Sequence, residues 1–334
     1  MIILGLDIGY SNLKFVFGDG EDEKKEVILP SGAGPLTSLP ITLTGERIDR
    51  GVEVKVGDEL WASGVAHQYL SGVTRELHAN YPATNTYEAL FKAALITTGA
   101  TTIDVLVTGL PVDQFKDNDT VAALKNSLQG VHKVNESKEV EVHRVIVIPQ
   151  PAGGYVNLIR QSDDETLNAI TSGITVSIDP GFFSVDWVVI DNGDIRSELS
   201  GTNLQAMSVV LKEISDSILE DTKARITVDR LEEAIRRGEN KFFAGNKTID
   251  ITPYVKKASL KISEQAMKPM LESLRHEHNA ISSIILSGGG ANFYKEIAGE
   301  LFADTSIFTG DKPVLANANG FYNVGCNAAK YQES

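Results

Sequence analysis

Residues 177–191 read SIDPGFFSVDWVVID, and residues 6–19 read LDIGYSNLKFVFGD. Placing Asp7 on Asp179 gives a constant offset of 172 residues (179 − 7), and the glycine two positions later then coincides in both copies. Each copy runs from an apolar segment through an aspartate, a glycine and a short turn into a second apolar segment that ends at another aspartate. We therefore predict that the same β-hairpin occurs twice, at the start of each of two similar halves.

The length and composition predict a cytoplasmic protein with two lobes. A chain of 334 residues is long for a single core, and its 42% apolar content can fill two. No segment approaches the ~18 consecutive apolar residues that span a bilayer, and the chain begins with the strand-like MIILGLDIG rather than a basic leader. Cys326 is the only cysteine, which fits a reducing compartment. We expect no membrane association.

The charge balance argues against direct binding to nucleic acid. The formal net charge is −14, whereas duplex binding relies on many Lys and Arg side chains that replace counterions. A magnesium nucleotide is still compatible with this charge, because backbone N–H groups and a metal can hold phosphates without a basic surface. Contact with DNA would then require a separate DNA-binding adaptor protein.

The order of predicted elements is that of two α/β halves. In the first half, short apolar strands precede a helix over 85–98, which Thr84 or Asn85 caps and Gly99 ends. The second half opens again with a strand and its hairpin. Further strands are predicted over 103–110, 142–148, 174–178, 187–190 and 283–286, and further helices over 119–129, from about 155, over 204–220, 228–238, 259–276 with a bend or break at Pro269, and over 316–329.

The repeated hairpin has the chemistry of a phosphate and metal site. An aspartate at the end of a buried strand, followed by a glycine turn, places a carboxylate beside backbone N–H groups, which suits Mg²⁺ and phosphate oxygens together. A single D-x-G turn is common in purely structural hairpins. Two matched copies instead favour a pair of turns that hold one polyphosphate.

A glycine run, Gly288-Gly289-Gly290, follows the predicted strand 283–286. It would let the backbone approach a nucleobase or phosphate closely, and the alternative is a flexible turn into the next helix. The run is not a Walker P-loop, because no GK[ST] follows, and the first strand lacks the G-x-G-x-x-G spacing of a dinucleotide site.

Five segments, in order, resemble the nucleotide-site motifs of the superfamily of actin, sugar kinases and heat-shock chaperones. The resemblance covers essentially the whole chain. The short length and the IPQPAGGY segment look most like the ParM/StbA-type actin-like ATPases, which form filaments with ATP. The fold that this implies is α/β, with two duplicated RNase H-like lobes around a nucleotide cleft. The segments are DIGYSNLK (7–14), PQPAGG (149–154), DPGFFSVD (179–186), LSGGGAN (286–292) and ANANGF (316–321).

The resemblance also implies domain bounds and site residues. The first lobe would comprise 1–154 and 316–334 with a small insertion at about 30–80, and the second 155–315 with a helical insertion at about 204–258. Asp7 and Asp179 would hold the hydration shell of Mg²⁺, Lys14 would reach the phosphates of ATP, or alternatively GTP, and Gln150 would orient the attacking water. The remaining matched residues are Gly9, Tyr10, Ser11 and Asn12 in the first phosphate turn, Gly181, Phe182, Phe183 and Ser184 in the second, Gly288, Gly289, Gly290 and Asn292 in the adenosine loop, and Asp229, Arg230 and Glu233 on the helix beside ribose and base.

The second turn departs from the family pattern. Phe182 and Phe183 replace small hydroxyl residues, and Asp186 stands where the first copy has Lys14. Considered alone, Gln150 is better interpreted as a buried amide that satisfies the backbone near two prolines. The resemblance implies a slow ATPase that assembles with itself into filaments, for plasmid or DNA partition through an adaptor or for another cytoskeletal role. The alternatives are a small-molecule kinase with Asp186 as base, and a nucleotide-binding adaptor with little turnover.

Overall fold

The structure, a computed structural model, describes residues 1–20, 23–41, 43, 51–244 and 247–330. It divides into two compact units, Met1–Asn168 with Gly310–Ser334, and Ala169–Thr309. The first unit continues past residue 154 because helix α4 (Gln150–Gln161) packs against helix α10 (Ala316–Lys330). Parts of the two expected insertions (42, 44–50 and 245–246) and the last residues of the first lobe (331–334) lie outside the described residues.

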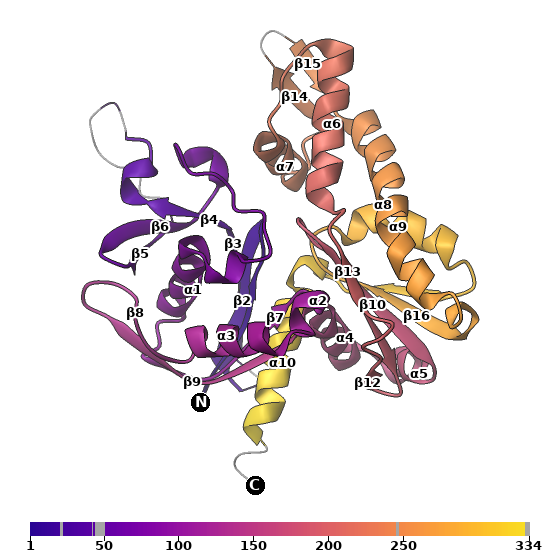
Figure 1. Cartoon of the computed structure of the whole chain (residues 1–334), viewed down its shortest axis with the longest axis horizontal. Helices are drawn as coiled ribbons and strands as arrows, with labels where there is room; N and C mark the ends of the chain where they lie inside the picture. Colours follow the sequence, from indigo (N-terminus) through magenta and orange to yellow (C-terminus); the bar gives the residue numbers. More distant parts are fainter. Residues whose placement is uncertain (21–22, 42, 44–50, 245–246, 331–334) are drawn as a thin grey trace. The chain divides into compact units, whose positions relative to one another are not determined.

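A six-stranded sheet of order β3-β2-β1-β7-β9-β8 forms the first unit's centre (Figure 1). The opening hairpin pairs β1 with β2, while β1, β7 and β9 run parallel. Their carboxyl ends therefore meet at one edge of the sheet, where α/β folds place ligand sites. The strands are β1 (Ile2–Ile8), β2 (Asn12–Asp19), β3 (Glu23–Pro30), β7 (Thr102–Leu110), β8 (Gly130–Lys133) and β9 (Glu139–Pro149).

Helices cover both faces of this sheet because successive strand residues point to opposite sides. Helix α1 (Asn85–Thr98) buries its apolar residues with Leu4 and Leu6, whereas α10 packs on the face that carries Ile3. The caps of α1 agree with the prediction, since Thr84 accepts from Tyr87 N–H and Gly99 adopts a left-handed conformation. The first unit also contains α2 (Val112–Phe115) and α3 (Asn118–Leu128), and α5 (Asp164–Thr171) spans the boundary.

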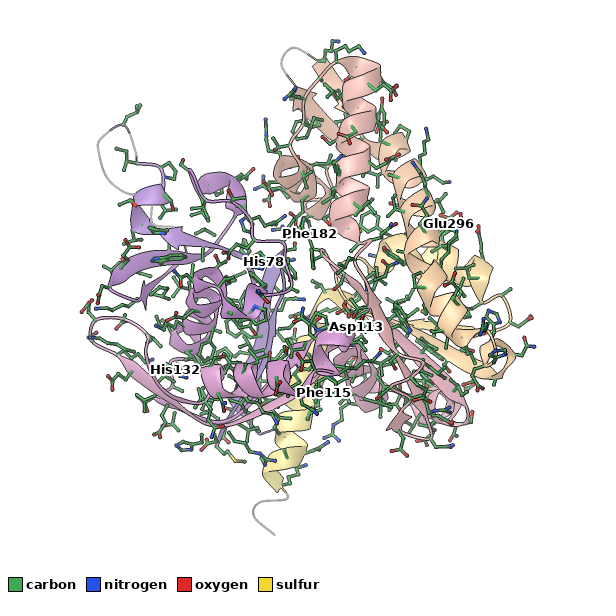
Figure 2. All side chains as sticks on the ribbon, viewed as in Figure 1. His78, Asp113, Phe115, His132, Phe182 and Glu296 are labelled. Carbon is green, nitrogen blue, oxygen red and sulfur yellow. The ribbon has the colours of Figure 1, made fainter. Side chains whose placement is uncertain are left out.

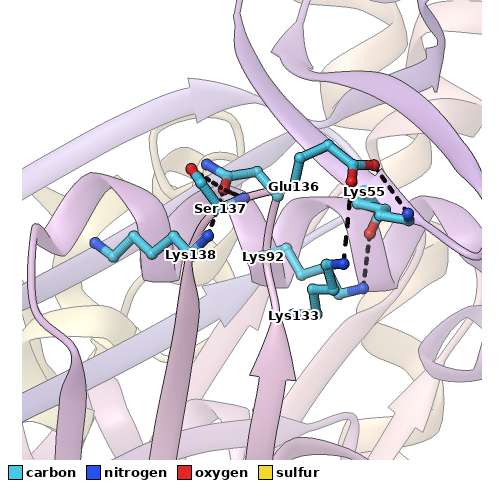
Figure 3. Close-up of polar contacts among 7 residues, drawn as sticks. Lys55, Lys92, Lys133, Glu136, Ser137 and Lys138 are labelled. Atoms are coloured by element: carbon cyan, nitrogen blue, oxygen red, sulfur yellow. Dashed lines mark hydrogen bonds and ion pairs between the residues drawn. The ribbon is translucent and has the colours of Figure 1, made fainter.

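A three-stranded sheet of β4 (Gly32–Pro35), β5 (Val52–Val56) and β6 (Glu59–Val65) forms the described part of the small insertion. The Lys55 N–H donates to the Val134 carbonyl at 2.9 Å, and the Lys55 ammonium meets Glu136 at 2.8 Å. The buried Lys92 of α1 donates to the Lys55 carbonyl at 2.7 Å, and Figure 3 shows Lys55 between Lys92 and Glu136. These contacts fasten β5 to α1 and to the β8–β9 connection.

The second unit repeats the hairpin in a sheet of order β12-β11-β10-β16-β17, with β13 also on β11. Strands β10 and β16 are parallel, as β1 and β7 are in the first unit. Helices α6 and α7 and a small hairpin, β14–β15, lie together in the helical insertion (Figure 1). The elements are β10 (Ile174–Pro180), β11 (Val185–Asp191), β12 (Asp194–Ile195), β13 (Gly201–Asn203), β14 (Lys241–Ala244), β15 (Lys247–Asp250), β16 (Ile281–Leu286), β17 (Ser306–Thr309), α6 (Met207–Thr222), α7 (Val228–Arg236), α8 (Thr252–Leu274) and α9 (Ala291–Leu301).

Two helix predictions were wrong. Helix α4 begins at Gln150 rather than near Tyr155, because Pro151 lies in the first turn, where a missing N–H costs nothing. Its glycines serve close helix contact: a Cβ on Gly153 would overlap α10, and one on Gly320 would overlap the Gly153 carbonyl. Helix α8 runs from Thr252 to Leu274 with Pro269 inside it, so the predicted start at 259 was late and no break occurs.

Candidate nucleotide site

The duplicated hairpin folds into the same turn in each unit. In the first, the Gly9 N–H donates to the Asn12 carbonyl at 3.0 Å. In the second, the Gly181 N–H donates to the Ser184 carbonyl at 2.8 Å. The donor and the acceptor of the second bond each lie 172 residues after their counterparts in the first, which is also the offset between Asp7 and Asp179. The repeat found in the sequence is therefore a repeat of backbone structure.

In each hairpin, the aspartate lies across from the position at which the two copies differ in charge. Asp7 lies opposite Lys14, and Asp179 lies opposite Asp186. The Lys14 ammonium meets the Asp7 carboxylate at 2.6 Å, with both side chains buried. Cross-strand neighbours of opposite charge stabilise a hairpin, whereas like charges in this position destabilise it. The second hairpin thus brings two carboxyl groups together where the first has an ion pair.

The first turn is fastened to residues at both ends of the small insertion. The Tyr10 carbonyl accepts from the Ser31 hydroxyl at 2.6 Å, and the Tyr10 hydroxyl donates to the His78 carbonyl at 2.8 Å. The Tyr10 ring also stacks on Tyr81 with centroids 4.4 Å apart. Tyr81 in turn meets the edge of Tyr87, 5.6 Å away. The turn is therefore held by aromatic packing as well as by hydrogen bonds.

Gln150 reaches the same sheet edge as Asp7. Leu6 pairs with Thr108 on parallel β7, and Leu110 pairs with Pro149 on parallel β9, so the ends of all three strands align. Gln150 is the first residue of α4, and it packs so closely on Gly109 that a Cβ there would approach its Cγ to 2.8 Å. Gln150 thus lies at the carboxyl edge of the sheet.

In the second unit the aspartate rests on the glycine run. Gly288 has φ +78°, and a Cβ at this position would overlap the Asp179 carboxylate. The Ser287 N–H donates to the Ile178 carbonyl and the Gly290 N–H to the Pro180 carbonyl, each at 2.9 Å. The glycines therefore allow the close approach of the two loops, and Gly288 is required at its position because only glycine adopts this φ without strain.

Phe182 of the second turn is a core residue, and its carbonyl contacts the start of helix α6. Phe182, labelled in Figure 2, is 9% exposed, and Phe183 is partly buried. The carbonyls of Gly181 and Phe182 accept from the Met207 and Ser208 N–H groups at the start of α6, at 3.3 and 2.9 Å. These carbonyls are thus turned toward the helix.

A row of polar side chains crosses the second sheet at this turn. Asp186 lies opposite Asp179 on one side and opposite Thr202 of β13 on the other. The Asp186 carboxylate, 1% exposed, accepts from the Ser184 hydroxyl at 2.6 Å and from the Thr202 hydroxyl at 2.5 Å. Two charge-assisted hydrogen bonds thereby stabilise a carboxylate that faces another carboxylate.

The candidates on α7 take part in contacts inside the helical insertion. The Arg230 guanidinium lies over the Phe242 ring at 5.0 Å, and Glu233 forms ion pairs with Arg236 and Arg237 at 3.3 and 2.7 Å. Asp229 lies in the first turn of α7, and the exposed Asn292 in the first turn of α9. A role for these four residues in binding ribose or base stays a prediction.

Each of the two aspartates, within its own unit, has the chemistry of a ligand for a hydrated magnesium ion. Asp7 and Asp179 are 2% and 8% exposed, and each is the last residue but one of a strand at the carboxyl edge of its own sheet. Within the described part of the chain, no group of three or more His, Cys, Asp or Glu residues could hold a metal on its own. Mg²⁺ characteristically takes one or two carboxylates and completes its shell with water and substrate phosphates.

Sequence reasoning missed several residues that shape these turns. Ser31 and Thr202 lie far along the chain from the residues that they contact, so no local pattern marks them. Tyr87 was also missed. Burial raises the pKa of the Tyr87 hydroxyl, and the negative charge of Asp7 raises it further. Tyr87 thus lies near the first aspartate, beneath the stacked Tyr81.

Two family descriptions match the chain, one in each half. Residues 5–153 match the N-terminal domain of actin-like proteins, and residues 177–298 match the C-terminal domain of archaeal MreB-like actin homologues. The chain is therefore an actin-like protein, a member of the actin-like ATPase superfamily with the actin-like fold.

The chain is similar to an archaeal actin homolog in sequence, and to archaeal and ParM-type proteins in fold. An archaeal actin homolog of Thermoplasma volcanium is 25% identical and aligns over 96% of this chain and 98% of its own. The archaeal actin homolog Ta0583 in complex with ADP has a TM-score of 0.77 and 22% identity over 99% of this chain and 100% of its own. A ParM subunit from a 15-stranded filament of Clostridium botulinum has a TM-score of 0.74 and 19% identity over 98% of this chain and 99% of its own.

Of the helices in the described ranges, none is both long and apolar enough to cross a membrane.

Proposed function

We propose that this protein binds ATP, or alternatively GTP, with Mg²⁺ through its two phosphate turns, assembles with itself into filaments and hydrolyses the nucleotide slowly. The observation that carries the proposal is the identical closure of the two turns, each beside a buried aspartate at a strand end. The ADP complex of one relative and the filament of another support the nucleotide and the self-association respectively. Plasmid or DNA partition through an adaptor, in the cytoplasm, is the cellular role that we propose for such filaments.

Hydrolysis of a γ-phosphate needs charge neutralisation and an aligned water more than covalent catalysis. Different residues would meet these two needs. Asp7 and Asp179 would hold the magnesium ion through its waters, and the ion would neutralise phosphate charge. Lys14 is a cation already paired with Asp7, so the pair would present a site of low net charge to the ligand. Gln150 would orient the water. An amide is a poor base, so we expect slow turnover.

A kinase activity with Asp186 as catalytic base is the weaker alternative. A base needs access to the proton that it removes. Asp186 is 1% exposed and accepts from two hydroxyl groups, which stabilise its charged form and restrict that access. Phosphate release without any acceptor supports hydrolysis, whereas ADP formation that depends on an added acceptor supports the kinase. Binding without either reaction would support the third candidate, an adaptor with little turnover.

The test compares Gln150→Ala with a matched control on the same helix, Gln161→Ala. Gln161 ends α4 and donates to Asn157 at 3.1 Å, away from the sheet edge. We expect Gln150→Ala to pellet with Mg-ATP as the parent does but to release phosphate at least about tenfold more slowly, and Gln161→Ala to resemble the parent in both assays. Unchanged phosphate release in Gln150→Ala would refute its role, and a parent protein that never sediments with Mg-ATP or a slowly hydrolysed analogue would refute filament assembly.

A further inference from the structure

A small polar cavity borders the first phosphate turn. Tyr10 of this turn and Tyr81 are its aromatic lining, and His67, Arg75 and Glu76 supply polar side chains. The volume of the cavity is about 10 Å³, close to the least that holds one water molecule. The cavity is therefore too small for an organic ligand, and its polar lining distinguishes it from an empty apolar void.

His67 carries a proton on Nε2. The Ser31 hydroxyl donates its only proton to the Tyr10 carbonyl at 2.6 Å, because a carbonyl can only accept. The Nε2 atom of His67, which lies 3.3 Å from the same hydroxyl, must therefore be the donor in that contact. This assignment holds for the neutral and for the protonated imidazole, since Nε2 bears a proton in both. In the neutral ring Nδ1 is then an acceptor.

Glu76 brings a second acceptor to the same cavity. Its Oε2 atom is buried, and among the described residues no group donates a hydrogen bond to it. Arg75 lines the cavity as well, but it is not bonded to this oxygen. Buried polar atoms of this kind are commonly satisfied by an ordered water. The oxygen therefore needs a small donor that the described part of the chain does not supply.

Water suits these groups because each molecule carries two donor protons. We infer that the cavity binds one ordered water, which donates to Oε2 of Glu76 and links it to the imidazole of His67. The water continues the hydrogen bonds that run from the Tyr10 carbonyl through Ser31 to His67. Residues at both ends of the small insertion are thereby joined to the first turn through one buried molecule. The inference goes beyond the proposed function and does not depend on nucleotide binding.

A crystal structure of the full-length chain, at a resolution that shows ordered waters, is the direct test. We expect one water in this cavity, about 2.5–3.0 Å from Oε2 of Glu76. The water should be absent from Glu76→Met, whose side chain has a similar length but no carboxylate. A parent protein without this water, or with Oε2 bonded to a protein group instead, would overturn the inference. Persistence of the water in Glu76→Met would overturn it too, because Glu76 would then not hold it.

Urea titrations give a second test, through the ratio of folded to unfolded protein. Glu76→Met should lower this ratio about tenfold, because the bound water loses its acceptor. Glu139→Met is the matched control, since Glu139 is an exposed glutamate of the same unit and its replacement changes the charge equally. We expect the control to change the ratio by less than about twofold. Glu76→Gln keeps an acceptor oxygen and should resemble the parent.

A ratio in Glu76→Met that equals or exceeds that of Glu139→Met would overturn the inference, because removal of an oxygen without any partner is expected to stabilise the fold. If Glu76→Met does not fold, the crystal structure of the parent still decides. Neither measurement involves nucleotide or filaments, so a negative result would leave the proposed function unaffected.

Discussion

Gly288 offers a sharp test of the second phosphate turn, because its neighbour Gly289 is a natural control. Gly288 has φ +78°, and a Cβ there would overlap the Asp179 carboxylate. Gly289 has no such φ, is exposed, and a Cβ would meet no atom within 4 Å. The two substitutions to alanine are therefore chemically identical and differ in the backbone conformation of the site and in what the added methyl group contacts.

Two effects add in Gly288→Ala. The left-handed conformation costs an L-residue about 1–2 kcal/mol, so the free energy of unfolding should fall by at least this amount. The methyl group must also displace the Asp179 carboxylate, which we propose holds the metal. We expect the affinity for Mg-ADP to fall by roughly tenfold or more, equivalent to about 1.4 kcal/mol. Gly289→Ala should change unfolding by less than about 0.5 kcal/mol.

Urea unfolding and calorimetric titration with Mg-ADP measure the two effects on the same preparations. The comparison is between the variants, so errors in the extrapolation to water largely cancel. If Gly288→Ala and Gly289→Ala behave alike in both assays, Gly288 does not hold Asp179 in place and the reasoning fails. Loss of stability without loss of affinity would refute only the role of Asp179 in binding.

The other predictions concern the first unit. Tyr10→Phe removes the hydrogen bond to the His78 carbonyl but keeps the ring stack, so the free energy of unfolding should fall by about 1 kcal/mol in urea titrations, and no change would show that this bond contributes nothing. Thr84→Ala removes the cap that accepts from the Tyr87 N–H, so the free energy of unfolding should fall by about 1 kcal/mol in thermal unfolding. No change would show that water replaces the cap fully. Burial lowers the pKa of His132 (labelled in Figure 2) below its usual 6.5, so the unfolded state takes up the proton first. Stability should therefore fall as the pH drops below about 6.5, and His132→Gln should flatten this dependence; an unchanged pH profile would contradict it.

Elements whose ends or turns are set by nearby residues could be predicted from the sequence. The bounds of α1 were correct because a cap and a left-handed glycine define both ends within the helix's own sequence. The two hairpins were found because their apolar runs and their glycines repeat at one offset. Strands of four residues such as β8 and β17 were missed, because a short strand is specified by its partner rather than by its own residues.

The candidate site divides in the same way. Asp7, Lys14, Asp179 and the glycines could be identified from the repeat, since backbone chemistry demands those residue types. The partners that set the behaviour of each turn, among them Ser31 and Thr202, come from other strands and could not be inferred from spacing. The helix after this strand was predicted to begin near Tyr155, whereas it begins at Gln150, with a proline in its first turn and glycines that let it contact α10.

Helix α10 imposes an order on folding during synthesis. One face of the first sheet, including Ile3 and Val107, is buried by Phe321 and Tyr322, which are made more than 200 residues after the strands they cover. The second unit is continuous in sequence from Ala169 to Thr309 and needs no later residue. We therefore expect the second unit of a ribosome-bound chain to fold first. Until α10 is made, the first sheet keeps one apolar face uncovered, and chaperones could bind there.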